Sequence, residues 1–172
     1  MGEAGHLAKR FAGSLLPAGP RSVDAAWAQD QLLPAEIDLW QRMSRADRRH
    51  AVGVARRAAS ALGADATRST LAAALLHDVG KVASGLGAYG RVIATLSVKA
   101  AGRNQAVAWS ETRGFTRRVG LYAQHPQLGA DLLELAGSDP LTVTWARQHH
   151  LPEDQWTVPR AIGDALKAAD DD

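Results

Sequence analysis

The chain has 172 residues, a length that favours one domain or one domain with a short extension. Hydrophobic residues make up 46% of it, enough for a core, yet no apolar run reaches the ~18 to 20 residues that a membrane span needs. The formal net charge is only +2 and cysteine is absent, which excludes disulfides and thiolate metal sites, so that any metal ion needs nitrogen and oxygen ligands.

The first quarter of the chain predicts short helices. We interpret its start as that of a mature soluble protein, because the apolar segment there is too short and interrupted for a signal peptide. Residues 5–16 predict a short amphipathic helix, a second helix carries Trp27, and a third lies within residues 32–43. We expect residues 1–43 to form a helical extension packed on a domain that spans 44–172.

Two helices with clear boundary signals follow. Ser44 resembles an N-terminal cap, and the helix after it should run to about Leu62, where a glycine stops it. The next helix is apolar, is capped by Thr67 or Ser69, and ends in the sequence HDVGK at 77–81. An imidazole beside a carboxylate at the end of an apolar helix needs partners, because burying either group unpaired costs several kcal/mol.

The second half of the chain also predicts helices and contains no long alternating pattern typical of strands. Residues 103–122 predict a further helix, which Gly114 and Gly120 weaken. The expected segments, in order, are a loop over 85–90, helices over 91–102, 103–122, 125–137 and 138–150, a loop over 151–159, and a last helix over 161–172.

Five of the six histidines fall at helix ends or on inward-facing positions. Taken singly, each has an ordinary structural explanation: a core histidine, a capping residue, a cation at a helix C-terminus, or one partner of an ion pair. Taken together they indicate that several helices deliver imidazoles to one place. The residues of this pattern are His50, His77 with Asp78, His125, and the pair His149 and His150.

This ordered set resembles the HD-domain superfamily of metal-dependent phosphohydrolases. The resemblance covers roughly residues 44–172 and implies an all-α HD-domain helical bundle. The matching pieces are His50, LLHDVGK at 75–81, HPQLG at 125–129, QHH at 148–150, and an aspartate in the closing KAADDD.

The resemblance also implies the metal ligands. One divalent transition-metal ion would be held by His50, His77, Asp78 and Asp170, with Asp171 the second choice for the last position and Asp164 a weaker one. A second ion, if present, would be held by Asp78, His125, His149 and His150. Nitrogen and oxygen ligands of this kind suit Fe, Mn, Ni, Co or Zn.

The same resemblance assigns catalytic roles to Asp78 and Lys81. Asp78 would bridge the two metal ions, which activate a hydroxide as nucleophile. Lys81 would neutralise a phosphate oxygen. The alternative for Lys81 is a cation that interacts with the C-terminal end of the helix dipole.

This chain lacks two features of one branch of the superfamily, which restricts the expected substrate. The branch of the superfamily that hydrolyses cyclic di-GMP carries a GYP motif after its histidine pair, where this chain reads LPEDQWTVP. Some members of that branch bind a third metal through a glutamate at the position of Ala46. Without these two features, the chain resembles the smaller HD hydrolases that act on nucleotides.

The candidate residues for binding substrate, apart from Lys81, lie outside these motifs. Arg113 and Arg117 share a helical face before HPQLG and could bind phosphate, although a solvated basic face explains them equally. Trp156 follows the histidine pair and could stack on a base, whereas Trp145 is expected in the core.

We therefore expect a cytoplasmic phosphohydrolase that acts on a phosphate ester or anhydride of a small nucleotide-like substrate. The alternative is a nucleotide-sensing or regulatory module of the same fold that does not turn its ligand over. A membrane is not an expected partner, and the small net charge disfavours nucleic acid. The sequence leaves the oligomeric state, the metal and its number open.

Overall fold

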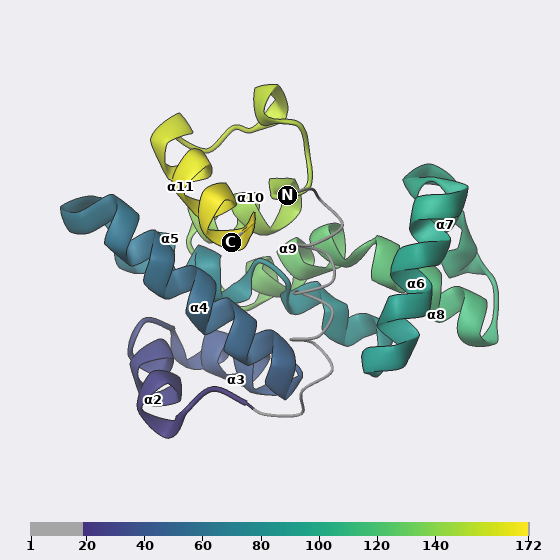
Figure 1. The fold of residues 1–172 in the computed structure, drawn as a ribbon, viewed down its shortest axis with the longest axis horizontal. Helices are drawn as coiled ribbons and strands as arrows, with labels where there is room; N and C mark the ends of the chain where they lie inside the picture. The colour runs from purple at the N-terminus through teal and green to yellow at the C-terminus, as the bar shows by residue number, and fades with distance from the viewer. Residues whose placement is uncertain (1–18, 172) are drawn as a thin grey trace, which may run out of the picture.

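The computed structural model describes residues 19–171, and this part of the chain is built from helices with no strand. The prediction of an all-α helical bundle is confirmed (Figure 1). The helix expected over residues 5–16 lies outside the described residues. Among the helices that are described, none combines the length and the apolar character that crossing a bilayer requires.

The helices follow one another closely along the chain, with short connections. In order they are α2 (Ser22–Asp30), α3 (Pro34–Arg42), α4 (Arg45–Leu62), η1 (Gly63–Asp65), α5 (Arg68–Leu76), η2 (Val79–Ser84), α6 (Ala88–Ala101), α7 (Arg103–Ala108), η3 (Trp109–Glu111), α8 (Gly114–Ala123), α9 (His125–Leu135), α10 (Pro140–Gln148), η4 (Glu153–Gln155) and α11 (Arg160–Asp171), where η marks a 3₁₀ helix.

The main hydrophobic core surrounds α5. Every residue of α5 from Thr70 to Leu76 is buried, so it packs against α4 on one side and α10 on another. Helix α9 packs against α10 and η2, helix α11 packs against α4, and the two contribute Leu133 and Leu166 to the core. A helix buried on all sides is apolar all round, as the part of α5 with the sequence LAAALL is.

Helices α2 and α3 belong to the same core. Ala28, Leu39 and Trp40 are buried within it, and Figure 1 shows both helices beneath α4. The segment interpreted as an extension therefore buries part of its surface against α4, and its apolar residues are continuous with those of the rest of the molecule.

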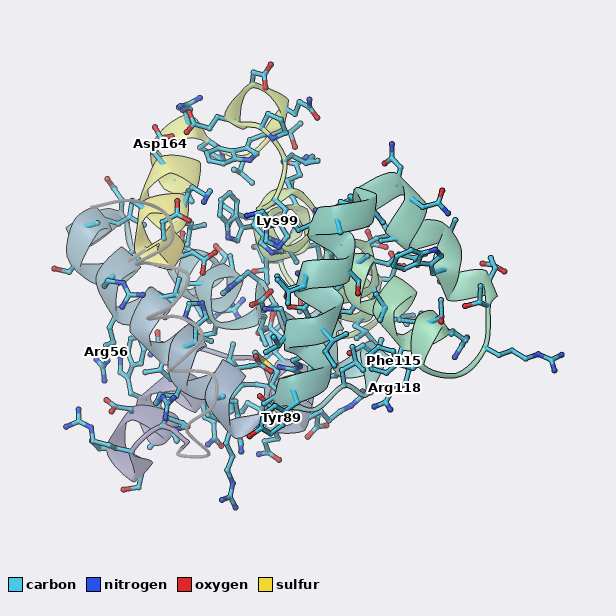
Figure 2. The ribbon with its side chains drawn as sticks, turned by 45° about the vertical axis from the view of Figure 1, so that its right-hand side comes forward. Arg56, Tyr89, Lys99, Phe115, Arg118 and Asp164 are labelled. Carbon is cyan, nitrogen blue, oxygen red and sulfur yellow. The ribbon has the colours of Figure 1, made fainter. Side chains whose placement is uncertain are left out.

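Helices α6, α7 and α8 form a second, smaller cluster, on the right in Figure 1. Leu86, Ala94 and Val119 are buried at its centre. Its outer face is partly apolar: Figure 2 labels Tyr89 on α6 and Phe115 on α8, which are 78% and 45% exposed. This cluster adjoins the main core through η2, against which α8 packs.

The sequence predicted this second cluster least well. The expected single helix over 103–122 is two helices, α7 and α8, separated by η3. Gly120 does not weaken α8 but allows a close approach, because a Cβ there would lie 2.2 Å from the backbone nitrogen of Ser110. Helix α6 begins at Ala88, inside the segment expected to be a loop, because Gly87 occupies its N-cap position.

Candidate metal centre

Five separate elements deliver the predicted ligands to one place. His50 lies within α4, His77 and Asp78 follow α5, and Asp170 lies in the last turn of α11. The remaining imidazoles come from two adjoining helix ends: His125 is the first residue of α9, and His149 and His150 follow α10. The centroids of neighbouring rings in the five histidines are 4.1 to 5.8 Å apart.

The histidine–aspartate pair lies where α5 changes into η2. His77 still has helical backbone angles, whereas Asp78 has φ −101° and ψ 7° and begins the 3₁₀ helix. This change of path turns the two consecutive side chains toward the same centre, so that His77 Nε2 lies 3.4 Å from Asp78 Oδ2. On a regular helix two consecutive side chains do not face each other.

A close contact between η2 and α9 brings the second set of histidines to Asp78. A Cβ at Gly80 would lie 1.9 Å from the carbonyl oxygen of His125 and 2.5 Å from the backbone nitrogen of Gly129. Glycine is therefore required at position 80, because any side chain would push α9 away. The glycines of HDVGK and HPQLG thus explain how the backbones of two distant segments can touch.

The first group of ligand atoms contains His50, His77 and Asp78, which can place one ligand atom each within 4.8 Å of one another. Asp170 joins them: its Oδ1 lies 2.8 Å from Nε2 of His50 and 3.6 Å from Nε2 of His77. Asp171, the second choice at the sequence level, instead pairs with Lys167 at the surface, 2.5 Å away. Asp164 also points away and pairs with Arg160.

The second group contains Asp78, His125, His149 and His150, again with one ligand atom each within 4.8 Å of the others. Oδ1 of Asp78 lies 3.2 Å from Nε2 of His125 and 3.7 Å from Nε2 of His149. His150 extends the group, with its Nε2 3.2 Å from that of His125. Asp78 is common to both groups, and its two oxygens face different histidines.

The backbone fixes the orientation of the three buried imidazoles. Nδ1 of His77, His125 and His149 lies 2.7 to 2.9 Å from the carbonyl oxygen three residues earlier. A carbonyl can only accept, so Nδ1 is the donor in each ring and the proton of the neutral tautomer lies there. Nε2 is therefore the free ligand atom, and it points into the centre in all three rings.

The electrostatics of the centre keep Asp78 ionised. Burial alone would raise its pKa, but the positive charges of Lys81 and His77 outweigh burial and hold the pKa of Asp78 well below its usual range. Burial favours the neutral ring of His77, yet the carboxylates of Asp78 and Asp170 raise the pKa of His77 to about 9. A divalent cation would compete with this proton for Nε2.

The imidazoles of His125 and His149 are kept neutral, the form in which they can act as ligands. Burial lowers the pKa of His125 against the opposing effect of Asp78. Burial and the neighbouring ring of His150 hold the pKa of His149 well below its ordinary value. Neutral imidazole is the form that coordinates metals.

Three polar atoms at the centre have no hydrogen-bond partner although they are buried: Nε2 of His77, Nε2 of His149 and Oδ1 of Asp78. Leaving such atoms unsatisfied costs about 1–3 kcal/mol each. All three belong to the two groups described above, so cations bound by these groups would satisfy them. These buried histidines and aspartates can therefore hold a metal ion.

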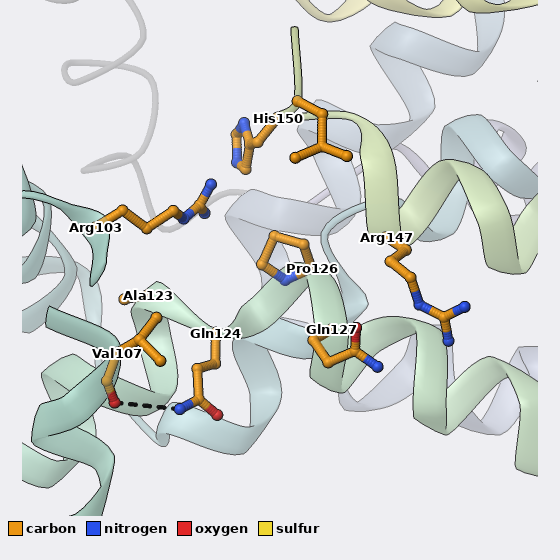
Figure 3. Close-up of a pocket in the computed structure, with 9 residues that line it drawn as sticks. Arg103, Val107, Ala123, Gln124, Pro126, Gln127, Arg147 and His150 are labelled. Carbon is orange, nitrogen blue, oxygen red and sulfur yellow. Dashed lines mark hydrogen bonds between the residues drawn. The ribbon is translucent and has the colours of Figure 1, made fainter. Parts of the chain in front are cut away.

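A cavity of about 310 Å³ opens beside the second group, at His150 (Figure 3). Its wall includes Arg103, Val107, Pro126 and Leu151. Sequence reasoning missed Arg103, because nothing in the local sequence indicates that α7 faces the histidine pair.

Of the residues expected to bind substrate, Lys81 lies at the centre beside Asp78, whereas Arg113, Arg117 and Trp156 do not line this cavity. Arg113, the N-cap residue of α8, and Arg117 within α8 are both exposed. Trp156 packs on the buried core residue Trp145, with ring centroids 5.3 Å apart, and its Nε1 donates to the carbonyl of Leu151. The expectation that Trp145 belongs to the core is confirmed.

Comparison of the chain with models of known protein families, with curated proteins and with solved structures gave no match.

Proposed function

We propose that this protein is a metal-dependent phosphohydrolase of the HD-domain type, which hydrolyses a phosphate ester or anhydride of a small nucleotide-like substrate. The observation that supports it most strongly is the two groups of potential ligand atoms, most of them on buried residues, that share Asp78. One group corresponds to the set His50, His77, Asp78 and Asp170, and the other to Asp78, His125, His149 and His150. One or two divalent transition-metal ions would be bound there.

Divalent ions bound in such a site polarise a phosphoryl group and lower the pKa of water toward neutrality. The chain's own residues hold and orient the site. The carbonyls of Ala74, Tyr122 and Ala146 fix the three buried rings with Nε2 inward. Lys81 pairs with Asp78 and keeps a positive charge beside it, which balances part of the charge of a bound phosphate.

The metal site is tested by its contents and its turnover together. Elemental analysis by inductively coupled plasma mass spectrometry should detect a transition metal in the purified protein. It should also hydrolyse p-nitrophenyl phosphate or a member of a nucleotide panel when supplied with Mn, Ni, Co or Fe. His77→Ala and Asp78→Asn should lose both the bound metal and the activity, because each removes a ligand atom from the centre.

The matched control is Asp164→Asn, which changes an exposed aspartate of α11 that is paired with Arg160. It should keep metal content and turnover, and circular dichroism should show that all variants are folded. Full metal occupancy in Asp78→Asn would overturn the ligand assignment. Absence of turnover with every metal, together with tight nucleotide binding, would favour a sensing module.

A further inference from the structure

The cavity beside His150 combines an apolar wall with one unpaired guanidinium. Val107, Ala123, Pro126 and Leu151 supply the apolar part, and Arg103 reaches in from α7. Figure 3 shows the Arg103 side chain directed toward the His150 ring. Its volume of about 310 Å³ lies at the lower end of the range for small-molecule sites, about 300–1,000 Å³.

The three cations around this region differ in their partners. Lys81 is paired with Asp78. Arg147 also lines the cavity but donates to Glu134 Oε1 at 2.9 Å. Arg103 forms no hydrogen bond or ion pair with the described part of the chain, so its five donors are available to a ligand.

Arg103 shares this cavity with a candidate metal ligand. Both Arg103 and His150 line it, and His150 belongs to the second group of ligand atoms. An anion bound by Arg103 would therefore lie beside the second group.

We propose that Arg103 binds a second phosphate of the substrate, adjacent to the phosphate held by the histidine–aspartate centre, and that the apolar wall of the cavity receives the organic group attached to it. The substrate class is therefore a phosphoanhydride that carries a small organic group, rather than a simple phosphate monoester. This inference rests on the proposed function and deepens it.

The chemistry of hydrolysis supports this choice. Water forms a new bond to the phosphorus held at the centre, the bridging P–O bond breaks, and the departing phosphate keeps the electron pair of that bond. Negative charge therefore increases on the departing phosphate. A guanidinium without a counterion, placed beside it, stabilises that charge and can form two parallel hydrogen bonds to its oxygens.

Binding of an unreactive anhydride separates this role from metal binding. The probe is ADP with a methylene group in place of the bridging oxygen, and inorganic phosphate is the reference ligand; both are titrated calorimetrically in the presence of Mn. Arg103→Ala should weaken binding of the ADP analogue about 10- to 100-fold. It should change the affinity for inorganic phosphate less than about 3-fold, because only the analogue has a second phosphate.

A conservative variant and a control variant complete the test. Arg103→Lys keeps the charge but loses the fork of donors, so its affinity for the analogue should lie between those of the wild type and Arg103→Ala. Lys99→Ala removes an exposed cation of α6 that does not line the cavity, and it should behave as wild type. Steady-state kinetics should show the same pattern: Arg103→Ala lowers kcat/KM for ADP and leaves that for p-nitrophenyl phosphate nearly unchanged.

The outcomes distinguish this inference from the proposed function. Turnover of both substrates that is insensitive to Arg103→Ala would overturn the inference and leave the function standing. Equal weakening of analogue and phosphate, or no binding of the analogue to the wild type, would also overturn it. If no metal supports turnover but binding of the analogue still depends on Arg103, the proposed hydrolase activity is wrong. The phosphate-binding role of Arg103 would then remain supported.

Discussion

At the scale of single residues, Asp78 determines how the centre is arranged. Its Oδ1 faces His125 and His149, while Oδ2 faces His77 and Lys81. The two oxygens of one carboxylate thus touch both groups of imidazoles, which is the arrangement expected of a ligand shared by two cations. The Lys81 ammonium keeps this carboxylate ionised when no cation is bound.

The last ligand can be tested with two adjacent residues of α11. Asp170→Asn should weaken binding of a divalent transition metal at least about 10- to 100-fold, because it removes a charged oxygen beside His50 and His77. Asp171→Asn should leave the affinity unchanged, because that side chain is half-exposed and paired with Lys167. Calorimetric titration of metal into both variants measures the difference, and equal affinities would contradict the assignment of Asp170.

At the scale of elements, the contact between η2 and α9 decides whether Asp78 meets the second set of histidines. The two backbones touch at Gly80 and Gly129, where a Cβ on Gly129 would still lie 3.1 Å from the nitrogen of Gly80. Position 80 is the stricter of the two, since its Cβ would overlap the carbonyl of His125. The packing of α9 against η2 therefore also determines where His125 lies.

Gly80→Ala should consequently be destabilising. The added methyl group forces η2 and α9 apart, and overpacking of this kind lowers the free energy of unfolding by about 1–3 kcal/mol or more. For a chain of this length that corresponds to a fall in Tm of about 2–4 °C per kcal/mol. Gly87→Ala is the control, because a Cβ there meets nothing within 4 Å. Thermal unfolding followed by circular dichroism compares them, and equal Tm values would contradict the steric argument.

Local signals explain which elements the sequence could predict. Ser44 accepts a hydrogen bond from the backbone of Asp47, and Thr67 accepts one from Thr70, as their positions before helices indicated. Gly63 follows the last residue of α4. These features depend on residues three or four apart, so they can be recognised without knowledge of the fold.

Contacts between distant segments explain what the sequence could not predict. The requirement for Gly80 depends on the backbone of His125, and Gly120 is explained only by its contact with η3. Arg103 lines a cavity with His150 because α7 and α9 share that cavity, which no periodicity in the sequence shows. The expected ligands could be named because a resemblance supplied the long-range relation that spacing alone lacks.

At the scale of the whole molecule, an ion pair joins the second cluster to the main core. Arg91 of α6 pairs with Asp47 in the first turn of α4, and its Nε donates to the carbonyl of Leu86. Both side chains of the pair are largely buried, with exposures of 17% and 15%. Because Asp47 also accepts from Ser44, the pair connects α6 to the cap of α4.

Arg91→Ala should therefore loosen the second cluster more than the main core. Removing one partner leaves Asp47 partly buried without its cation, a loss that typically costs more than an exposed pair. Hydrogen exchange of backbone amides should accelerate in α6 and α8 and remain slow in α5. Arg117→Ala is the comparison, because Arg117 is exposed on α8. Uniform acceleration in all helices would show that the pair supports the fold as a whole.

Metal ions bound at both groups should stabilise the entire bundle, because the candidate ligands of the two groups together come from α4, the α5–η2 junction, α9, the end of α10, and α11. An ion that binds only the folded chain at 100 times its Kd adds about 2.7 kcal/mol to the free energy of unfolding. At about 2–4 °C per kcal/mol, Tm should rise by about 5–10 °C over metal-free protein. Differential scanning calorimetry with and without a chelator measures this shift.

The variant Asp170→Asn distinguishes stabilisation by a metal ion bound at this centre from a general effect of divalent ions on the protein. It lacks one oxygen of the centre, so at the same metal concentration the gain in Tm should be smaller than in the wild type, whereas Asp171→Asn should gain as much as the wild type. A metal-induced shift of equal size in all three proteins would place the ion somewhere other than between these helices. A gain in Tm that depends on Asp170 and not on Asp171 would assign the cation to the first group, where it ties together α4, the α5–η2 junction and α11, because only the folded chain brings their ligand atoms within reach of one ion.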